Sequence, residues 1–174
     1  MMYRFDAAGG IRTAQENNAI LGLAEQFDRS EFSTIEALVN FPMYVPRQNL
    51  TTFLVRYEIF KRILNVHGSI IEGGVGFGGG LMTWAQLSAI MEPTNHTRRI
   101  IGFDTFAGFP SVSAYDTAYP GMMKVDSQAE IEACVKLYDQ NRFVGHIPKV
   151  ELVKGDATKT IPQYIQDNPH LVVS

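Results

Sequence analysis

The chain has 174 residues, a length that suits a single domain built around one core. Its 45% hydrophobic and 19% charged residues are typical of a globular protein, and a net charge of -3 gives no reason to expect nucleic acid or an anionic membrane as partner. The single cysteine excludes an internal disulfide, and no apolar run reaches the roughly 18 residues that span a bilayer, so we expect a cytoplasmic protein.

Residues 1–68 are predicted to form an N-terminal helical region. Thr13 can cap a first helix, and Ser33 with Glu36 three residues later forms a capping box that opens a short second helix. A third and stronger helix follows, because apolar side chains recur on one face, at Phe53, Tyr57, Phe60 and Leu64. This helix is expected to end near Gly68.

From residue 69 onward, short β-branched strands alternate with helices. Strands are predicted at 69–72, 99–104 and 150–154, and a fourth begins at 171–173. Helices are predicted at 81–91, 127–142 and 158–167. Ser127 and Glu130 form a capping box for the middle helix, and Arg98-Arg99 reads as a solvated start to the second strand. The segment from about 105 to 125 is a long loop of the kind that is usually functional or mobile.

This alternation predicts an α/β fold. We expect a Rossmann-like, doubly wound and mostly parallel sheet in three α/β/α layers, with residues 69–174 forming a cofactor-binding core whose C-terminal half is incomplete. Such sheets bind ligands at the carboxyl ends of their strands. A glycine-rich loop, Asp104 and Asp156 all fall at such ends.

The glycine-rich loop lies in the stretch IIEGGVGFGGG, residues 70–80. Gly74, Gly76 and Gly79 satisfy G-x-G-x-x-G, in which bare backbone lets a pyrophosphate approach a helix N-terminus. Asp104, further along the chain, can serve as the acid that binds the ribose. An NAD(P)-dependent oxidoreductase is therefore one interpretation.

Glu72, at the mouth of this loop, favours a different cofactor. A carboxylate there repels a pyrophosphate, and a half-buried carboxylate without a cation is costly. S-adenosylmethionine carries an ammonium, a sulfonium and no phosphate. Glu72 can attract the ammonium, Asp104 can accept both ribose hydroxyls, and Asp156 can face the adenine amino group. Residues 72–78 also fit the E-x-G-x-G-x-G form of methyltransferases with this type of sheet.

The sequence is similar to the macrocin O-methyltransferase family over roughly residues 45–174. The similarity is carried by residues 71–75 with Gly78-Gly79 and by RIIGFDTFAGFP at 99–110, in which the segment from Gly102 to Pro110 is the most distinctive part. Members of that family transfer a methyl group from S-adenosylmethionine to a hydroxyl, often on a sugar of a natural product, with magnesium. The resemblance thus implies a small-molecule hydroxyl acceptor and Mg²⁺.

The expected cofactor-binding residues lie at the ends of the predicted strands or in the segments that come next. They are Glu72, Gly73, Gly74, Val75, Gly78, Gly80, Asp104, Thr105, Phe106, Asp156 and Ala157. The resemblance implies no catalytic residue and no metal ligand in this chain, because the family's metal-binding acids follow the fourth strand. We therefore expect a truncated enzyme with little or no activity alone. The non-enzyme alternative is a cofactor- or partner-binding fragment, which leaves open a homo-oligomer paired through a sheet edge.

Overall fold

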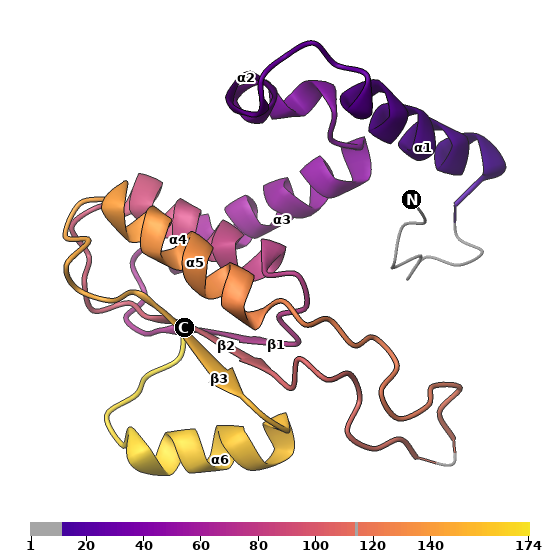
Figure 1. The fold of residues 1–174 in the computed structure, drawn as a ribbon. Helices are drawn as coiled ribbons and strands as arrows, with labels where there is room; N and C mark the ends of the chain where they lie inside the picture. The colour runs from indigo at the N-terminus through magenta and orange to yellow at the C-terminus, as the bar shows by residue number, and fades with distance from the viewer. Residues whose placement is uncertain (1–11, 114) are drawn as a thin grey trace. The chain divides into compact units, whose positions relative to one another are not determined.

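The computed structural model describes residues 12–113 and 115–174. Its helices are α1 (Ala14–Asp28), α2 (Thr34–Val39), the short 3-10 helix η1 (Phe41–Met43), α3 (Arg47–Ile63), α4 (Gly79–Met91), α5 (Gln128–Gln140) and α6 (Ala157–Asp167). Its strands are β1 (Ile70–Gly73), β2 (Ile100–Asp104) and β3 (Val150–Lys154) (Figure 1). The chain divides into two compact units within α3, between Val55 and Arg56.

The first unit is held together by local capping more than by burial. Thr13 and Ser33 accept the backbone N–H groups of Glu16 and Glu36, and both carboxylates accept an N–H in return, which confirms the two predicted N-termini. Among residues 12–55, only Ala37 is buried. These helices therefore gain little from an apolar core of their own.

The second unit is built on a parallel sheet with the order β1-β2-β3, which confirms the predicted α/β fold. The register pairs Ile70 with Ile100, and Ile100 with Val150. A parallel bridge between Ser69 and Val173 places the last residues on the other edge of β1. The predicted fourth strand is thus present as a single bridge, and β1 has neighbours on both sides.

Helices cover both faces of the sheet: α4 and α5 lie on one face and α6 lies on the other (Figure 1). The larger core is formed by side chains of the strands with α3, α4 and α5, among them Phe60, Leu81, Ala85, Ile100, Ile131 and Val150. The smaller core lies on the opposite face, where Ile101 and Phe103 pack with Tyr164 of α6. The alternation along β2 follows from the period of two in a strand, because neighbouring side chains point to opposite faces.

Arg98 joins several segments at the amino end of the sheet. The residue is 3% exposed, and its guanidinium donates to Glu92, to Ser174 Oγ and to the carbonyls of Ile63, Val66 and Gly68, at 2.7–2.9 Å. The interpretation of this residue as a solvated strand start is therefore wrong. A buried arginine is tolerated here because each of its five N–H groups has an acceptor.

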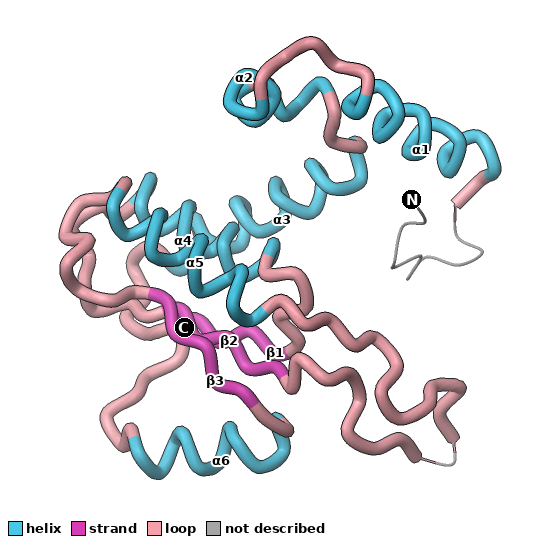
Figure 2. Tube along the Cα trace, viewed as in Figure 1, coloured by secondary structure: helices cyan, strands magenta, loops and turns pink. Residues whose placement is uncertain are grey.

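The loop between β2 and α5 is long, as predicted, and turns back on itself (Figure 2). The N–H of Phe109 donates to the carbonyl of Met122 at 3.0 Å, and the N–H of Gly121 donates to the carbonyl of Phe109 at 2.9 Å. A β-carbon on Gly108 would lie 2.5 Å from the carbonyl oxygens of Gly121 and Met122. Glycine at position 108 thus lets the two arms of the loop approach each other.

Candidate functional site

The candidate site lies at the carboxyl end of β1, where the strand order reverses. From β1 the sheet extends to β2 and β3 on one side and to Val173 on the other. Open α/β sheets bind their ligands outside the carboxyl ends of the strands at such a switch point. The glycine-rich loop begins there, directly after Gly73.

The glycines of this loop have two different surroundings. Gly74, Gly76 and Gly78 have φ angles of 80°, 55° and 84°, a left-handed backbone that favours glycine. A β-carbon on Gly74 or Gly76 would meet nothing within 4 Å, whereas one on Gly78 would lie 2.7 Å from Ile131. One on Gly80 would lie 2.6 Å from Arg56 Nη2 and closer still to Glu72. The early glycines therefore border open space, and Gly78 and Gly80 make room for protein side chains.

Side chains from two other elements hold the middle of the loop. The N–H of Gly76 donates to Asp104 Oδ2 at 2.7 Å, and Ser127 Oγ donates to the carbonyl of Gly76 at 2.5 Å. Ser127 is the N-cap residue of α5, but its side chain makes no capping hydrogen bond, so the predicted capping box with Glu130 is wrong. The physical reason is tertiary: the buried hydroxyl donates to the glycine loop.

Asp104 also shapes the turn that follows β2. Its Oδ1 accepts the N–H of Phe106 at 2.7 Å. Phe106 has a φ of 54°, an unfavourable conformation for a residue with a side chain, and the residue is 4% exposed. Thr105 steadies the next turn by donating from Oγ1 to the carbonyl of Gly108 at 2.6 Å. Each Asp104 oxygen keeps a second lone-pair direction, so the carboxylate can also accept a ligand hydroxyl.

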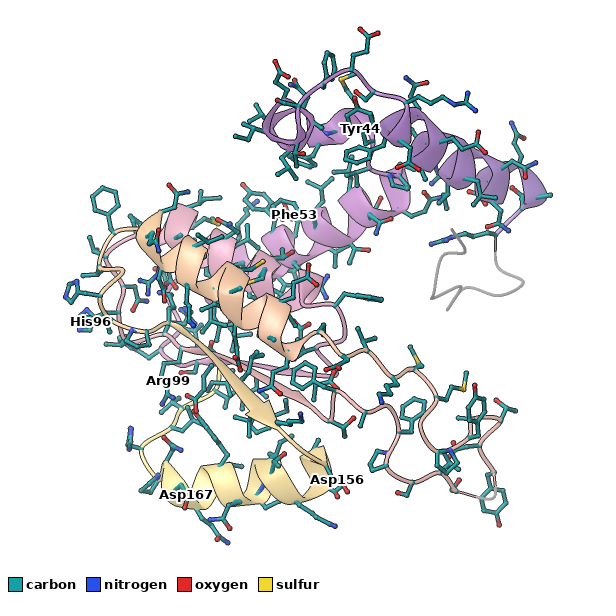
Figure 3. The ribbon with its side chains drawn as sticks, in the orientation of Figure 1. Tyr44, Phe53, His96, Arg99, Asp156 and Asp167 are labelled. Atoms are coloured by element: carbon teal, nitrogen blue, oxygen red, sulfur yellow. The ribbon has the colours of Figure 1, made fainter. Side chains whose placement is uncertain are left out.

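Asp156 lies at the start of α6, after the end of β3 (Figure 3). Its Oδ1 accepts the N–H of Thr158 at 3.0 Å and the hydroxyl of Thr158 at 2.8 Å, and these bonds lower the pKa of Asp156. The N–H of Gly155 donates to the carbonyl of Asp104 at 2.9 Å, which joins the ends of β2 and β3. Asp156 and Ala157 are thus placed beside Asp104 on the same edge of the sheet.

Glu72 is half-buried on β1, below the glycine loop. Its Oε2 atom is buried and has no hydrogen-bond partner among the described residues. Burial raises the pKa of Glu72, while the charge of Arg56 and the indole of Trp84 oppose that rise. A buried carboxylate oxygen without a donor is costly, so this atom suits a cationic ligand group.

A polar hollow of about 370 Å³ lies at the opposite end of the sheet. It is lined by Leu64, Asn65, Val66, His67, Gly68, Asn95, Thr97 and Arg98. The buried charge in this hollow is Arg98, and its five N–H groups are engaged with the protein. The carboxyl edge, which has an unpartnered acid and open glycines, is therefore the better candidate for ligand binding.

The fit of a divalent metal can be tested on the side chains present. Across residues 12–113 and 115–174, no three His, Cys, Asp or Glu side chains come together as a metal-binding group. The magnesium implied by the family resemblance therefore has no fitting ligand set in the described part of the chain. In the same residues, no helix is both long enough and apolar enough to cross a bilayer.

Comparisons with known proteins place this geometry in context. No protein-family model matches the chain, and no curated protein matches it either. Among solved structures, it is similar to CalS11, a calicheamicin methyltransferase, with 33% sequence identity and a TM-score of 0.88 over 93% of this chain. This chain shares the fold of that methyltransferase. A second structure, apo CalS11, described as a TDP-rhamnose 3'-O-methyltransferase, gives 31% identity and a TM-score of 0.78 over 92% of this chain.

The O-methyltransferase fold agrees with the methyltransferase interpretation of the sequence. The chain spans 66% and 64% of the two solved chains, just under two thirds of their length. The likeness supports a relation to O-methyltransferases, and the finer resemblance to the macrocin family stays a prediction. The roles of the predicted cofactor-binding residues also stay predictions.

The structure adds functional candidates that the sequence did not indicate. Ser127 ties α5 to the glycine loop, yet its spacing from Glu130 indicated only a helix cap. Arg56 and Trp84 lie close to Glu72, although each occupies an ordinary position in an amphipathic helix, Arg56 as a charged residue and Trp84 as an apolar one. No local pattern could have paired them, because the three residues come from α3, β1 and α4.

Proposed function

We propose that this chain binds S-adenosylmethionine and belongs to an enzyme that methylates a hydroxyl group of a small molecule. The observation that carries the proposal is the likeness to a sugar O-methyltransferase over 93% of the chain, with glycines and carboxylates at the switch point of the sheet. The methyl group would pass from sulfonium to oxygen by in-line displacement, for which the protein aligns the two partners and excludes water.

The chemistry of the site supports a cofactor without phosphate. Glu72, Asp104 and Asp156 lie at or just beyond the carboxyl ends of three adjacent strands, and none of the three forms an ion pair of 4.0 Å or less among the described residues. Three carboxylates at one edge repel a pyrophosphate and attract a cation. This argues against a nicotinamide-dependent oxidoreductase, even though the literal G-x-G-x-x-G pattern is present.

Each part of the cofactor has a proposed partner. Glu72 takes the ammonium, and the open backbone at Gly74 admits the methionine portion. Asp104 accepts the ribose hydroxyls through the free lone pairs of its two oxygens, and Asp156 with Ala157 lies where the adenine would reach. We assign no catalytic base among the described residues and route no step through a metal.

The acceptor is proposed by analogy with the relatives. Because CalS11 is described as acting on TDP-rhamnose, a deoxysugar linked to a nucleotide or to a natural product is the acceptor class we propose. We also propose that the protein works in the cytoplasm, where its single, exposed cysteine stays reduced. Association with a second copy stays a prediction.

Calorimetry with S-adenosylhomocysteine and NAD tests the cofactor. We expect S-adenosylhomocysteine to bind and NAD to give no heat of binding. Glu72→Gln and Asp104→Asn should each weaken the binding about tenfold or more, the range of a charged hydrogen bond. Binding of NAD in place of S-adenosylhomocysteine would contradict the proposal. Transfer of a labelled methyl group from S-adenosylmethionine to TDP-rhamnose would distinguish an enzyme from a fragment that only binds the cofactor.

A further inference from the structure

Three side chains from different elements meet beside the glycine loop. Arg56 of α3 lies with its guanidinium carbon 5.7 Å from the centre of the Trp84 ring of α4. A β-carbon on Gly80 would meet both Arg56 Nη2, at 2.6 Å, and Glu72 Oε1 of β1, closer still. The two charged groups therefore share one small space, which exists because residue 80 has no side chain.

The stacking on Trp84 limits where the guanidinium can lie. A cation over an indole face is attracted to the ring, which is worth about 0.5–2 kcal/mol. Arg56 is partly buried, so its charge is screened less than that of an exposed arginine. Held in this way, it acts on Glu72 as a nearby positive charge, and no ion pair of 4.0 Å or less joins the two among the described residues.

Glu72 has one oxygen on the Arg56 side and one without a partner. Oε1 faces the space over Gly80, whereas Oε2 is buried without a hydrogen-bond partner in the described part of the chain. Arg56 thus offsets part of the cost of burying the carboxylate charge and leaves Oε2 without a partner among the described residues. The remaining oxygen is left for a donor that the protein itself does not provide.

We propose that Arg56 is a positioning residue that keeps Glu72 ionised and holds it at the start of α4, so that Oε2 can accept the cofactor ammonium. This inference rests on the proposed function, since it concerns the same cofactor. Arg56 acts through Glu72 and does not itself contact the ligand. Helix α3 is thereby linked to the affinity for the cofactor.

The protonation of Glu72 gives the proposal a distinctive pH dependence. The groups that face the carboxylate are Arg56 from α3 and Trp84 from α4, and the residue beside it in β2 is Gly102, which has no side chain. Burial raises the pKa of Glu72 and the Arg56 charge lowers it, so removal of Arg56 must raise that pKa further. Cofactor binding, which needs the ionised carboxylate, should then weaken most at acidic pH and recover as the pH rises.

The test is the dissociation constant of S-adenosylhomocysteine, measured by calorimetry between pH 5.5 and 8. We expect Arg56→Met to weaken binding about tenfold at pH 6.5 and less at pH 8, within the range of coupling between neighbouring charged residues. Arg56→Lys should lose less, because it keeps the charge. In a Glu72→Gln background, Arg56→Met should change the affinity less than twofold. Arg62→Met, an exposed arginine on the same helix, is the matched control and should change nothing.

A second variant tests the geometry without removing a charge. Gly80→Ala must displace Glu72 and Arg56 from their shared space, and it should weaken binding while circular dichroism stays native. If Arg56→Met does not fold, Gly80→Ala alone tests the positioning role of Arg56. If the wild type binds but Arg56→Met, or failing that Gly80→Ala, binds with the same affinity and pH profile, the positioning role is wrong and the proposed function stands. If the wild type does not bind at all, both are overturned.

Discussion

Gly78 allows a quantitative test of how the glycine loop is packed. It has a φ of 84°, and a β-carbon there would lie 2.7 Å from Ile131 Cγ1 and 2.9 Å from Cδ1. The left-handed backbone costs a non-glycine residue about 1–2 kcal/mol. Overpacking against a buried isoleucine adds about 1–3 kcal/mol. Gly78→Ala should therefore lower the free energy of unfolding by about 2–5 kcal/mol.

The matched control is Gly74→Ala, in the same loop. Gly74 has a similar φ of 80°, but its β-carbon would meet nothing within 4 Å, so only the backbone cost of about 1–2 kcal/mol applies. Urea unfolding at a constant m-value gives both numbers. The affinity for S-adenosylhomocysteine should show the opposite order, because the space above Gly74 is the part proposed for the ligand.

A double-mutant cycle isolates the contact with Ile131. Ile131→Ala removes all three Ile131 atoms that the new β-carbon would meet, at a cost of about 2–5 kcal/mol for a buried isoleucine. In that background, Gly78→Ala should cost only the backbone term, so the cycle should give a coupling of about 1–3 kcal/mol. Equal losses for Gly74→Ala and Gly78→Ala, or no coupling with Ile131, would refute the reasoning.

Three further predictions concern stability and mobility. Arg98→Met takes a donor from three carbonyls and removes the buried cation that pairs with Glu92, whose carboxylate keeps only the neutral donors Ser88 and Asn95 among the described residues. It should lower the free energy of unfolding by about 3–5 kcal/mol in urea titrations, and a loss below about 1 kcal/mol contradicts this. Ser127→Ala removes the hydrogen bond to the Gly76 carbonyl, which is worth about 1–2 kcal/mol. The amides of residues 74–78 should therefore exchange hydrogen about 5–30 times faster. Unchanged exchange would show that this hydrogen bond does not stabilise the glycine loop. Burial lowers the pKa of Lys149 to about 8 from 10.5, with Glu92 opposing and Arg142 and Arg98 reinforcing the shift. The unfolded chain therefore holds a proton that the folded chain has lost between about pH 8 and 10.5, and stability should rise with pH by up to about 3 kcal/mol relative to Lys149→Met. Parallel curves for the two proteins across this range would show that Lys149 does not titrate as inferred.

Local signals predicted most of the elements. The caps at Thr13 and Ser33 were predictable because a capping box needs only residues three apart in sequence. The strands and their order of alternation were predictable from short β-branched runs followed by glycine or aspartate. The same local rule failed at Ser127, whose hydroxyl donates to a residue 51 positions away. A distant acceptor leaves no trace in the spacing of neighbouring residues.

The position of the candidate site could be predicted from the sequence, whereas most contacts between its residues could not. The glycines, Glu72 and Asp104 are recognisable because they lie at or just after the carboxyl ends of strands. Some of these glycines border open space and others pack against a side chain of another element. The difference depends on residues such as Ile131, which comes from another helix. Arg98 was also mispredicted for this reason. Its charge and its position before a strand indicate a solvent-exposed side chain, but its acceptors come from segments that only folding brings together.

The bridge between Ser69 and Val173 has a consequence for the newly made chain. One edge of β1 gains its partner from residues about one hundred positions later. At translation rates of 5–20 residues per second, that edge waits on the order of 5–20 s on the ribosome before its partner is made. During this interval, the unpaired backbone of β1 can join strands of neighbouring nascent chains. Slow synthesis should therefore lower the yield of native protein more than slow refolding of the finished chain does.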